Sequence, residues 1–314
     1  MVDRNELKVS YIRMTIREAV SLHTQGKLAE AETLYRKVLR KDPDNFDATH
    51  LLGVVEMQRG RYAPAIELLS KAVSLNSSQP QALANLGSAL LRANRTEEAL
   101  GRYERALELD PRFTGVLNNY GNTLQSLGRH VEAAAALGRL FDLAPDFDYA
   151  LGGMFQARRH SAEWHDFQQQ AASIVARVQA GKRADRPFSF LSVSDSGARQ
   201  LECARTYMSH LYPPSPSPLW RGERYGHDKI RIAYLSADFR AHAVANHMAA
   251  LYERHDPREF HTIGVSLTAY ENTDVVLRAK RVLGRFVDAA EMSDAAVTPT
   301  IRELEADIVV DLTG

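Results

Sequence analysis

The segment SADFRAHAVANHM, residues 236–248, holds the side chains best suited to acid–base chemistry. It follows an apolar run typical of a buried strand, and ligands of open α/β sheets bind beyond the carboxyl ends of strands. His242 lies just past that end. A histidine at this place can act as a general base or hydrogen-bond a substrate, because the unperturbed pKa of histidine is about 6.5. The alternative is an exposed loop residue without a catalytic role. Asp238 is expected to support it, either by bracing the loop or by capping the next helix.

Asparagines form a second candidate site, earlier in the chain. Asn85 and Asn119 are 34 residues apart, and Asn122 lies about one helical turn beyond Asn119. An asparagine side chain offers both a donor and an acceptor, which matches the amide groups of an extended peptide. The alternative is that these are solvated polar residues on an inner helix. We therefore expect Asn85, Asn119 and Asn122 to line a groove for an extended peptide.

Other catalytic and binding motifs are missing from the sequence. It contains no GxGxxG, GxxxxGK, GxSxG, HExxH or CxxC pattern, so we expect no metal and no cofactor in this chain. The single cysteine, Cys203, excludes an internal disulfide, fits a reducing compartment and is expected to be a packed, inert residue. Trp164 and Trp220 are expected to be packing anchors.

Composition restricts the partners. The 39 Lys and Arg residues balance 39 Asp and Glu residues, so the overall charge favours neither nucleic acid nor a membrane as a partner. The N-terminus has no apolar signal-peptide core, and no run of about 18 apolar residues occurs. We expect a cytoplasmic protein.

The elements that must position the asparagines recur every 34 residues. The recurring residues are Gly53, Gly87 and Gly121; Ala31, Ala65, Ala99 and Ala133; Gly26, Gly60, Asn94 and Gly128; and Pro43, Pro111 and Pro145. Small residues let two helices approach closely, Gly or Asn permits a left-handed turn between them, and proline ends the second helix. This period predicts four tetratricopeptide repeats within residues 12–147, at 12–45, 46–79, 80–113 and 114–147. Such repeats stack into a superhelix with a concave groove that suits extended peptides.

The rest of the chain changes character twice. Residues 148–212 predict a helical connector, and residues 213–228 a proline-rich linker with an extended path. From 229 to 314, strand and helix patterns alternate, which predicts a parallel sheet. We therefore expect an α solenoid followed by a partial α/β Rossmann-like lobe. Its last strand, ADIVVDL, has the continuous apolar character of a strand covered on both faces, so we expect only the first part of a larger domain.

The chain resembles the O-GlcNAc transferase (SPINDLY) family, especially its bacterial members. The resemblance lies in the repeats with NxxG-type first helices, in Trp164 with Asp166 of the connector, and in the run PLWRGERYGHDKIRIAYLSADFRAHAVANHM. It implies two Rossmann-like lobes that transfer N-acetylglucosamine from UDP-GlcNAc to Ser or Thr of proteins, with the repeats holding the acceptor. It places His242 at the family's first-lobe active-site histidine, and Asn85 and Asn119 at its groove asparagines.

The chain also departs from the family pattern. Ala243 replaces a frequent proline, and the donor-binding second lobe would lie beyond Gly314, so this chain is expected to be an inactive fragment. Two alternatives remain: a non-catalytic tetratricopeptide scaffold that binds peptides, and a relative that transfers fucose from GDP-fucose.

Overall fold

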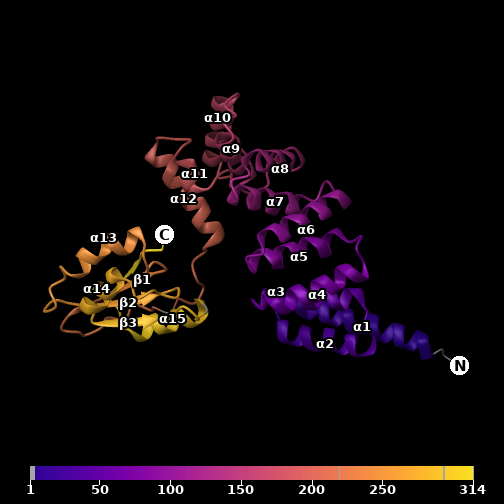
Figure 1. Cartoon of the computed structure of the whole chain (residues 1–314), viewed down its shortest axis with the longest axis horizontal. Helices are drawn as coiled ribbons and strands as arrows, with labels where there is room; N and C mark the ends of the chain where they lie inside the picture. Colours follow the sequence, from indigo (N-terminus) through magenta and orange to yellow (C-terminus); the bar gives the residue numbers. More distant parts are fainter. Residues whose placement is uncertain (1–3, 219, 293, 314) are drawn as a thin grey trace. The chain divides into compact units, whose positions relative to one another are not determined.

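The computed structural model describes residues 4–218, 220–292 and 294–313 (Figure 1). It divides into two compact units, Met1–Pro213 and Pro214–Gly314. Leu219 of the predicted linker and Gly314, beyond which a second lobe is expected, lie outside the described residues.

Four antiparallel helical hairpins build most of the first unit. They are α1 (Arg4–Thr24) with α2 (Leu28–Lys41), α3 (Phe46–Gln58) with α4 (Tyr62–Leu75), α5 (Pro80–Arg92) with α6 (Thr96–Leu109), and α7 (Thr114–Ser126) with α8 (His130–Leu143). From α3 onward, the first residues of successive first helices are 34 positions apart, as the sequence period requires. Helix α1 begins before the predicted start at residue 12, because residues 4–11 contain no glycine or proline that would end it.

Small residues allow each hairpin to close. A Cβ atom on Gly87 would lie 2.6 Å from Cε1 of the fully buried Tyr103, so only glycine fits there. Gly53 and Gly121 meet Leu69 and Leu137 in the same way one repeat before and after. The 34-residue recurrence of these glycines therefore follows from the close contact between the two helices of each hairpin, not from helix propensity.

The turns inside the hairpins adopt the left-handed conformation that the sequence predicts. Gly26, Gly60 and Gly128 have φ of 76°, 74° and 75°, and Asn94 has φ of 60° at the equivalent place. Asparagine is one of the few other residues that enter this region readily.

Beyond the hairpins the chain stays helical although the period is lost. It forms α9 (Ala150–His160), α10 (Phe167–Gln179), α11 (Pro187–Phe190) and α12 (Gly197–Leu211). One apolar cluster continues from Ala65 of α4 to Cys203 of α12, so α9–α12 extend the core of the repeats. Cys203 is buried and donates to the carbonyl oxygen of Asp185 at 3.4 Å, and burial raises the pKa of its thiol to about 11. A thiol with that pKa is a poor nucleophile at neutral pH.

The second unit is a four-stranded parallel sheet. Its strands are β1 (Ile230–Ser236), β2 (Phe260–Ser266), β3 (Arg285–Asp288) and β4 (Ile308–Asp311), in the order β3-β2-β1-β4. The predicted parallel sheet is confirmed. The helix before β3 ends at Val282, and Phe286 of β3 pairs with Gly264 of β2.

Helices cover both faces of this sheet. On one face, Ile232 and Tyr234 of β1 pack with residues of α13 (Ala243–Tyr252) and α14 (Asp274–Val282). On the other face, Ala233 of β1 and Ile263 of β2 pack with α15 (Asp294–Glu303). The alternation along β1 therefore serves two apolar layers, as expected for a strand of a parallel sheet.

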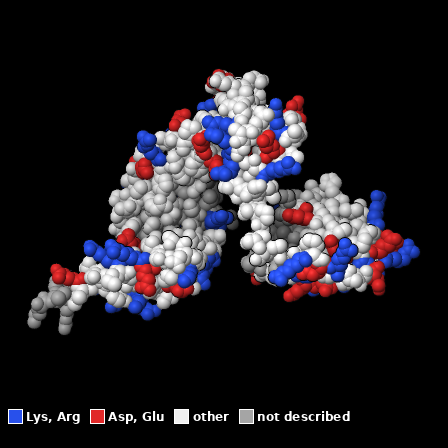
Figure 2. All heavy atoms as spheres, turned by 180° about the vertical axis from the view of Figure 1, so that it is seen from behind, with Lys and Arg blue, Asp and Glu red and all other residues white. Residues whose placement is uncertain are grey.

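Charged side chains of both signs share the surface. On the face drawn in Figure 2, Lys and Arg lie among Asp and Glu in both units, and many are paired, such as Arg95 with Glu98 and Arg278 with Glu253. No helix in the described part of the chain combines the length and apolar character that crossing a bilayer requires.

Candidate functional site

His242 stands at the start of α13, just beyond the carboxyl end of β1. Its backbone is extended, with φ of −141° and ψ of 155°, and its Nδ1 accepts a hydrogen bond from the Val244 N–H at 3.3 Å. The N-cap of the helix is therefore His242 itself. Its side chain is 41% exposed, which leaves the ring within reach of a substrate hydroxyl.

Asp238 braces the loop and does not cap the helix. Its backbone N–H donates to Ser236 Oγ at 3.0 Å, and its Oδ1 receives the Arg240 guanidinium at 3.2 Å. Its Oδ2 lies 3.2 Å from His242 Nδ1. Of the two roles open from sequence, the structure favours the bracing one.

The Nδ1 atom of His242 lies within hydrogen-bond distance of two partners, Asp238 Oδ2 and the Val244 N–H. With a proton on Nδ1 it donates to Asp238; without that proton it accepts from the Val244 N–H. These states are different tautomers of the neutral ring. In the first state the opposite nitrogen, Nε2, carries a free lone pair, and Asp238 stabilises the ring when Nε2 takes up a proton. The pair can therefore do general base chemistry on an approaching hydroxyl.

A groove on the repeats forms the second candidate site. It is a hollow of about 570 Å³, and its lining residues come from α3 to α7: Met57, Gln58, Tyr62, Ser88, Leu91, Arg92, Tyr103, Asn119, Asn122 and Thr123. Asn119 and Asn122 thus share one hollow, while Asn85 is not part of its lining. The volume is within the range of ordinary ligand sites.

The side-chain amides of Asn85 and Asn122 are engaged inside the protein. Asn85 Nδ2 donates to His50 Nε2 at 2.9 Å; burial lowers the pKa of His50, although Asp47 opposes this, so its ring is neutral and can accept. Asn122 Nδ2 donates to the Asn118 carbonyl oxygen at 2.8 Å, and its Oδ1 accepts from Arg186 at 3.4 Å. Either amide would have to exchange these bonds to hold a peptide.

Asn119 is the asparagine most open to a ligand. It is exposed, and its Oδ1 has only a long 3.5 Å contact from Asn118 Nδ2. Burial raises the pKa of the neighbouring Tyr103 hydroxyl, and hydrogen bonds from Ser88 and Asn119 offset part of that rise. Sequence spacing treated the three asparagines alike, whereas in the structure Asn119 is exposed beside Tyr103, and Asn85 and Asn122 are bonded to His50 and Arg186. It also adds Arg92 to the groove, a residue that no repeat signal marks.

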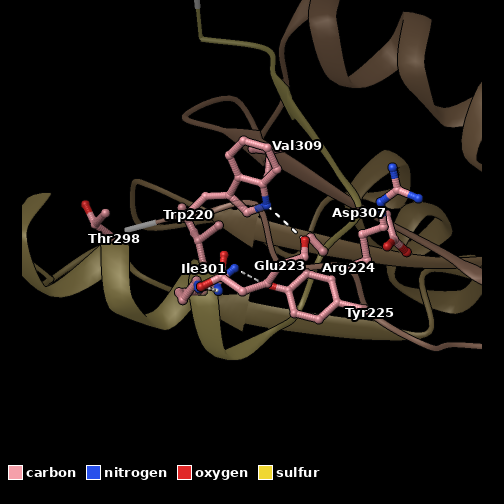
Figure 3. A pocket seen from close by; sticks show the side chains of 10 residues that line it. Trp220, Glu223, Arg224, Tyr225, Thr298, Ile301, Asp307 and Val309 are labelled. Atoms are coloured by element: carbon pink, nitrogen blue, oxygen red, sulfur yellow. Dashed lines mark hydrogen bonds and ion pairs between the residues drawn. The ribbon is translucent and has the colours of Figure 1, made fainter. Parts of the chain in front are cut away.

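The second unit has a larger hollow, of about 730 Å³, between the segment 220–225, α15 and β4 (Figure 3). Asp307 lies in its wall and accepts from the backbone N–H of Arg231 at 2.9 Å, at the amino end of β1. Because His242 follows the carboxyl end of β1, this hollow is at the opposite end of the strand.

Both tryptophans contradict their predicted role as packing anchors. Trp220, in the wall of this hollow, is 63% exposed and is held by a bond from its Nε1 to the Glu223 carbonyl oxygen at 3.1 Å (Figure 3). Trp164 is 56% exposed. Each lies outside a regular element, and the contact of the Trp164 ring with Phe167 of α10, 5.8 Å between ring centroids, leaves more than half of Trp164 exposed.

Two models of the tetratricopeptide repeat family match this chain, over residues 16–80 and 90–158. The helical hairpins are tetratricopeptide repeats. The second match includes most of α9, which agrees with the continuous core between α8 and α9. Here the sequence period and the packing of small residues lead to the same conclusion.

Individual similar proteins include a plant enzyme. The Arabidopsis thaliana protein described as probable UDP-N-acetylglucosamine–peptide N-acetylglucosaminyltransferase SEC is 25% identical over 139 residues, which is 41% of this chain. The match spans 14% of the plant protein's own length.

Two solved structures are also similar. A mutant O-GlcNAc transferase of Thermobaculum terrenum matches over 99% of this chain and 47% of its own, with 22% identity and a TM-score of 0.35. The first tetratricopeptide domain of Spaghetti, bound to an HSP90 peptide, matches 37% of this chain and 92% of its own, with 28% identity and a TM-score of 0.36.

Proposed function

We propose that this chain belongs to a protein O-glycosyltransferase, in which the repeats bind an extended acceptor polypeptide and His242 assists sugar transfer to a Ser or Thr hydroxyl. The observation that carries the catalytic part is the exposed His242 ring, with Asp238 Oδ2 3.2 Å from its Nδ1, at the carboxyl end of β1. The similarity to the plant N-acetylglucosaminyltransferase supports N-acetylglucosamine as the sugar and UDP-GlcNAc as the donor substrate.

In this proposal His242 is the base. The acceptor oxygen bonds to the anomeric carbon of the sugar while the bond from that carbon to the UDP leaving group breaks, and the hydroxyl proton passes to His242 Nε2. Asp238 holds the proton of Nδ1 and stabilises the charged ring that results. Arg240 limits the mobility of Asp238 by pairing with its other oxygen.

Labelled sugar transfer tests this role. The chain alone, and the chain joined to a donor-binding second lobe, are incubated with radiolabelled UDP-GlcNAc and a mixture of acceptor proteins, and parallel reactions contain GDP-fucose, the donor of the fucose-transferring alternative. The chain alone is expected to transfer no sugar, so the variants are compared in the joined form. His242→Ala should lower transfer by roughly 100-fold or more, given the usual contribution of a general base. His247→Ala is the matched control, since His247 is exposed on the same helix and does not contact Asp238.

Equal transfer by wild type and His242→Ala contradicts the role of His242. No transfer from either donor by the wild-type chain joined to the second lobe contradicts the enzymatic proposal for these residues. It favours the second candidate, a peptide-binding scaffold, which the groove's position wholly within the Met1–Pro213 unit supports.

Peptide binding is tested separately through the asparagines. Asn119→Ala should weaken extended peptides of different sequence alike, by about 0.5 to 1.5 kcal/mol, because one backbone hydrogen bond is lost. Asn85→Ala should weaken peptide binding less than Asn119→Ala, because the Asn85 amide must break its hydrogen bond to His50 before it can bind a peptide. Fluorescence anisotropy of labelled peptides measures both. A loss confined to one peptide sequence would argue against recognition of the backbone.

A further inference from the structure

We infer that the groove of the repeats selects acidic polypeptides, and that Arg92 pairs with a carboxylate side chain of the bound segment. The inference rests on the proposed peptide-binding function and names the chemical class of peptide. It concerns recognition of the peptide's side chains, whereas the asparagines are proposed to bind the peptide's backbone.

Arg92 is a free cation in the groove. It lies in the last turn of α5, its side chain is exposed, and it forms no ion pair or side-chain hydrogen bond within the described residues. Several arginines of the same repeats are paired: Arg95 with Glu98, Arg105 with Glu108 and Arg129 with Glu132. Arg102 of α6 forms no ion pair within the described residues, but it does not line the groove. Arg92 combines an unpaired charge with a place in the groove lining, so a ligand in the groove can reach that charge.

The remaining lining gives the groove one sign of charge. Among its described lining residues Arg92 alone is charged, and the others are amides, hydroxyls and apolar side chains. A second cation, Arg186, donates to Oδ1 of the lining residue Asn122 at 3.4 Å. With one guanidinium group in its lining, a second bonded to a lining residue and no carboxylate among the described lining residues, the hollow attracts acidic side chains and repels basic ones.

A carboxylate fits this cation by shape as well as charge. The planar guanidinium of arginine can donate two parallel hydrogen bonds to one carboxylate. Asn119 lines the same hollow, so a bound segment can place a backbone amide on Asn119 and a Glu or Asp side chain on Arg92 at once. Two cations are too few for a nucleic-acid backbone, which requires a basic stripe or patch.

Matched peptides test the inference with the full chain. A neutral peptide containing Ser and Thr is made with Glu at each position in turn, and again with Gln at that position. Affinities are measured by fluorescence anisotropy at low salt. At one or two positions the Glu peptide should bind about tenfold more tightly than its Gln counterpart, because a charge-assisted hydrogen bond is added.

Variants then assign the preference to Arg92. Arg92→Gln should abolish the difference between the Glu and Gln peptides while changing the affinity of the Gln peptides by less than about twofold. Arg92→Glu should favour the same peptides carrying Lys. Arg102→Gln is the matched control, because Arg102 is exposed on α6 and does not line the groove, and it should keep the full preference for Glu.

Each outcome is decisive. Equal binding of Glu and Gln peptides at every position, or a preference that survives Arg92→Gln, overturns the acidic selectivity but leaves peptide binding intact. If no peptide binds the wild-type chain, the proposed peptide-binding function fails together with this inference. Circular dichroism of each variant confirms that the helices are retained.

Discussion

Asp185 shows how one buried carboxyl group can set the response of a fold to pH. Its side chain is buried between α9 and α11; Oδ1 accepts from the Arg186 N–H at 2.8 Å and from the Ser189 hydroxyl, while Oδ2 has no hydrogen-bond partner. Burial raises its pKa from 3.8 to about 6, although these hydrogen bonds oppose the rise. Gly152 of α9 leaves the space for it, since a Cβ there would overlap the carboxylate.

The raised pKa predicts a loss of stability as pH rises. The folded state binds the Asp185 proton more tightly than the unfolded state, so its contribution is fully present below about pH 4 and is lost as pH rises through about 6. The difference amounts to roughly 3 kcal/mol at most. Asp185→Asn should therefore flatten the dependence of the unfolding free energy on pH across this window.

Urea unfolding at several pH values measures this effect. Asp195→Asn, at an exposed site in the following loop, removes the same formal charge and should leave the pH dependence unchanged. An Asp185→Asn variant with the wild-type slope would contradict the assignment.

The close packing of the two helices in a hairpin depends on a single glycine. In α5, Gly87 contacts the ring of Tyr103, which is fully buried and bonded through its hydroxyl to Ser88 at 3.2 Å. Because the ring is fully buried and its hydroxyl is bonded to Ser88, an added Cβ at Gly87 would force the ring or the helices to shift. The close approach of α5 and α6 thus depends on this glycine.

Gly87→Ala should destabilise the protein by about 1 to 3 kcal/mol, the usual cost of overpacking a core. Gly101→Ala provides the opposite case: Gly101 is helical and exposed, nothing lies within 4 Å of an added Cβ, and alanine should stabilise α6 by about 0.5 to 1 kcal/mol. Thermal and urea denaturation followed by circular dichroism compare the two. Similar effects of both substitutions would show that the contact with Tyr103 does not limit packing.

Within the Met1–Pro213 unit, the apolar core continues beyond the residues at which the 34-residue sequence period ends. Leu137 and Leu140 of α8 belong to the same apolar cluster as Leu151 and Met154 of α9, and that cluster continues to α12. A cut after residue 147 would expose this face of α8 to water. Helices α9–α12 therefore act as a cap on the stack, as terminal elements of repeat proteins do.

Two fragments test the stability of the whole unit. Residues 12–147 should remain helical, because four repeats exceed the usual minimum of about three. They should unfold at a temperature lower than residues 1–213 by roughly 5 °C or more, since apolar surface of α8 becomes exposed. Circular dichroism melting compares them. A largely unfolded 12–147 fragment would contradict the autonomy of the repeats, and equal melting temperatures would contradict the capping role.

The sequence alone was enough to predict the repeats and the parallel sheet. Contacts at Gly87 and left-handed turns at Gly60 and Asn94 recur at a fixed spacing, and strand alternation is a local pattern, so both are visible without coordinates. The sequence could not show that the amide of Asn119 is more accessible than those of Asn85 and Asn122, and no repeat position indicated that Arg92 lines the groove. Whether an amide or guanidinium is free depends on partners distant in sequence, such as His50 for Asn85 and Arg186 for Asn122. Only the tertiary structure decided those pairings, because they follow from the packing of different helices against one another.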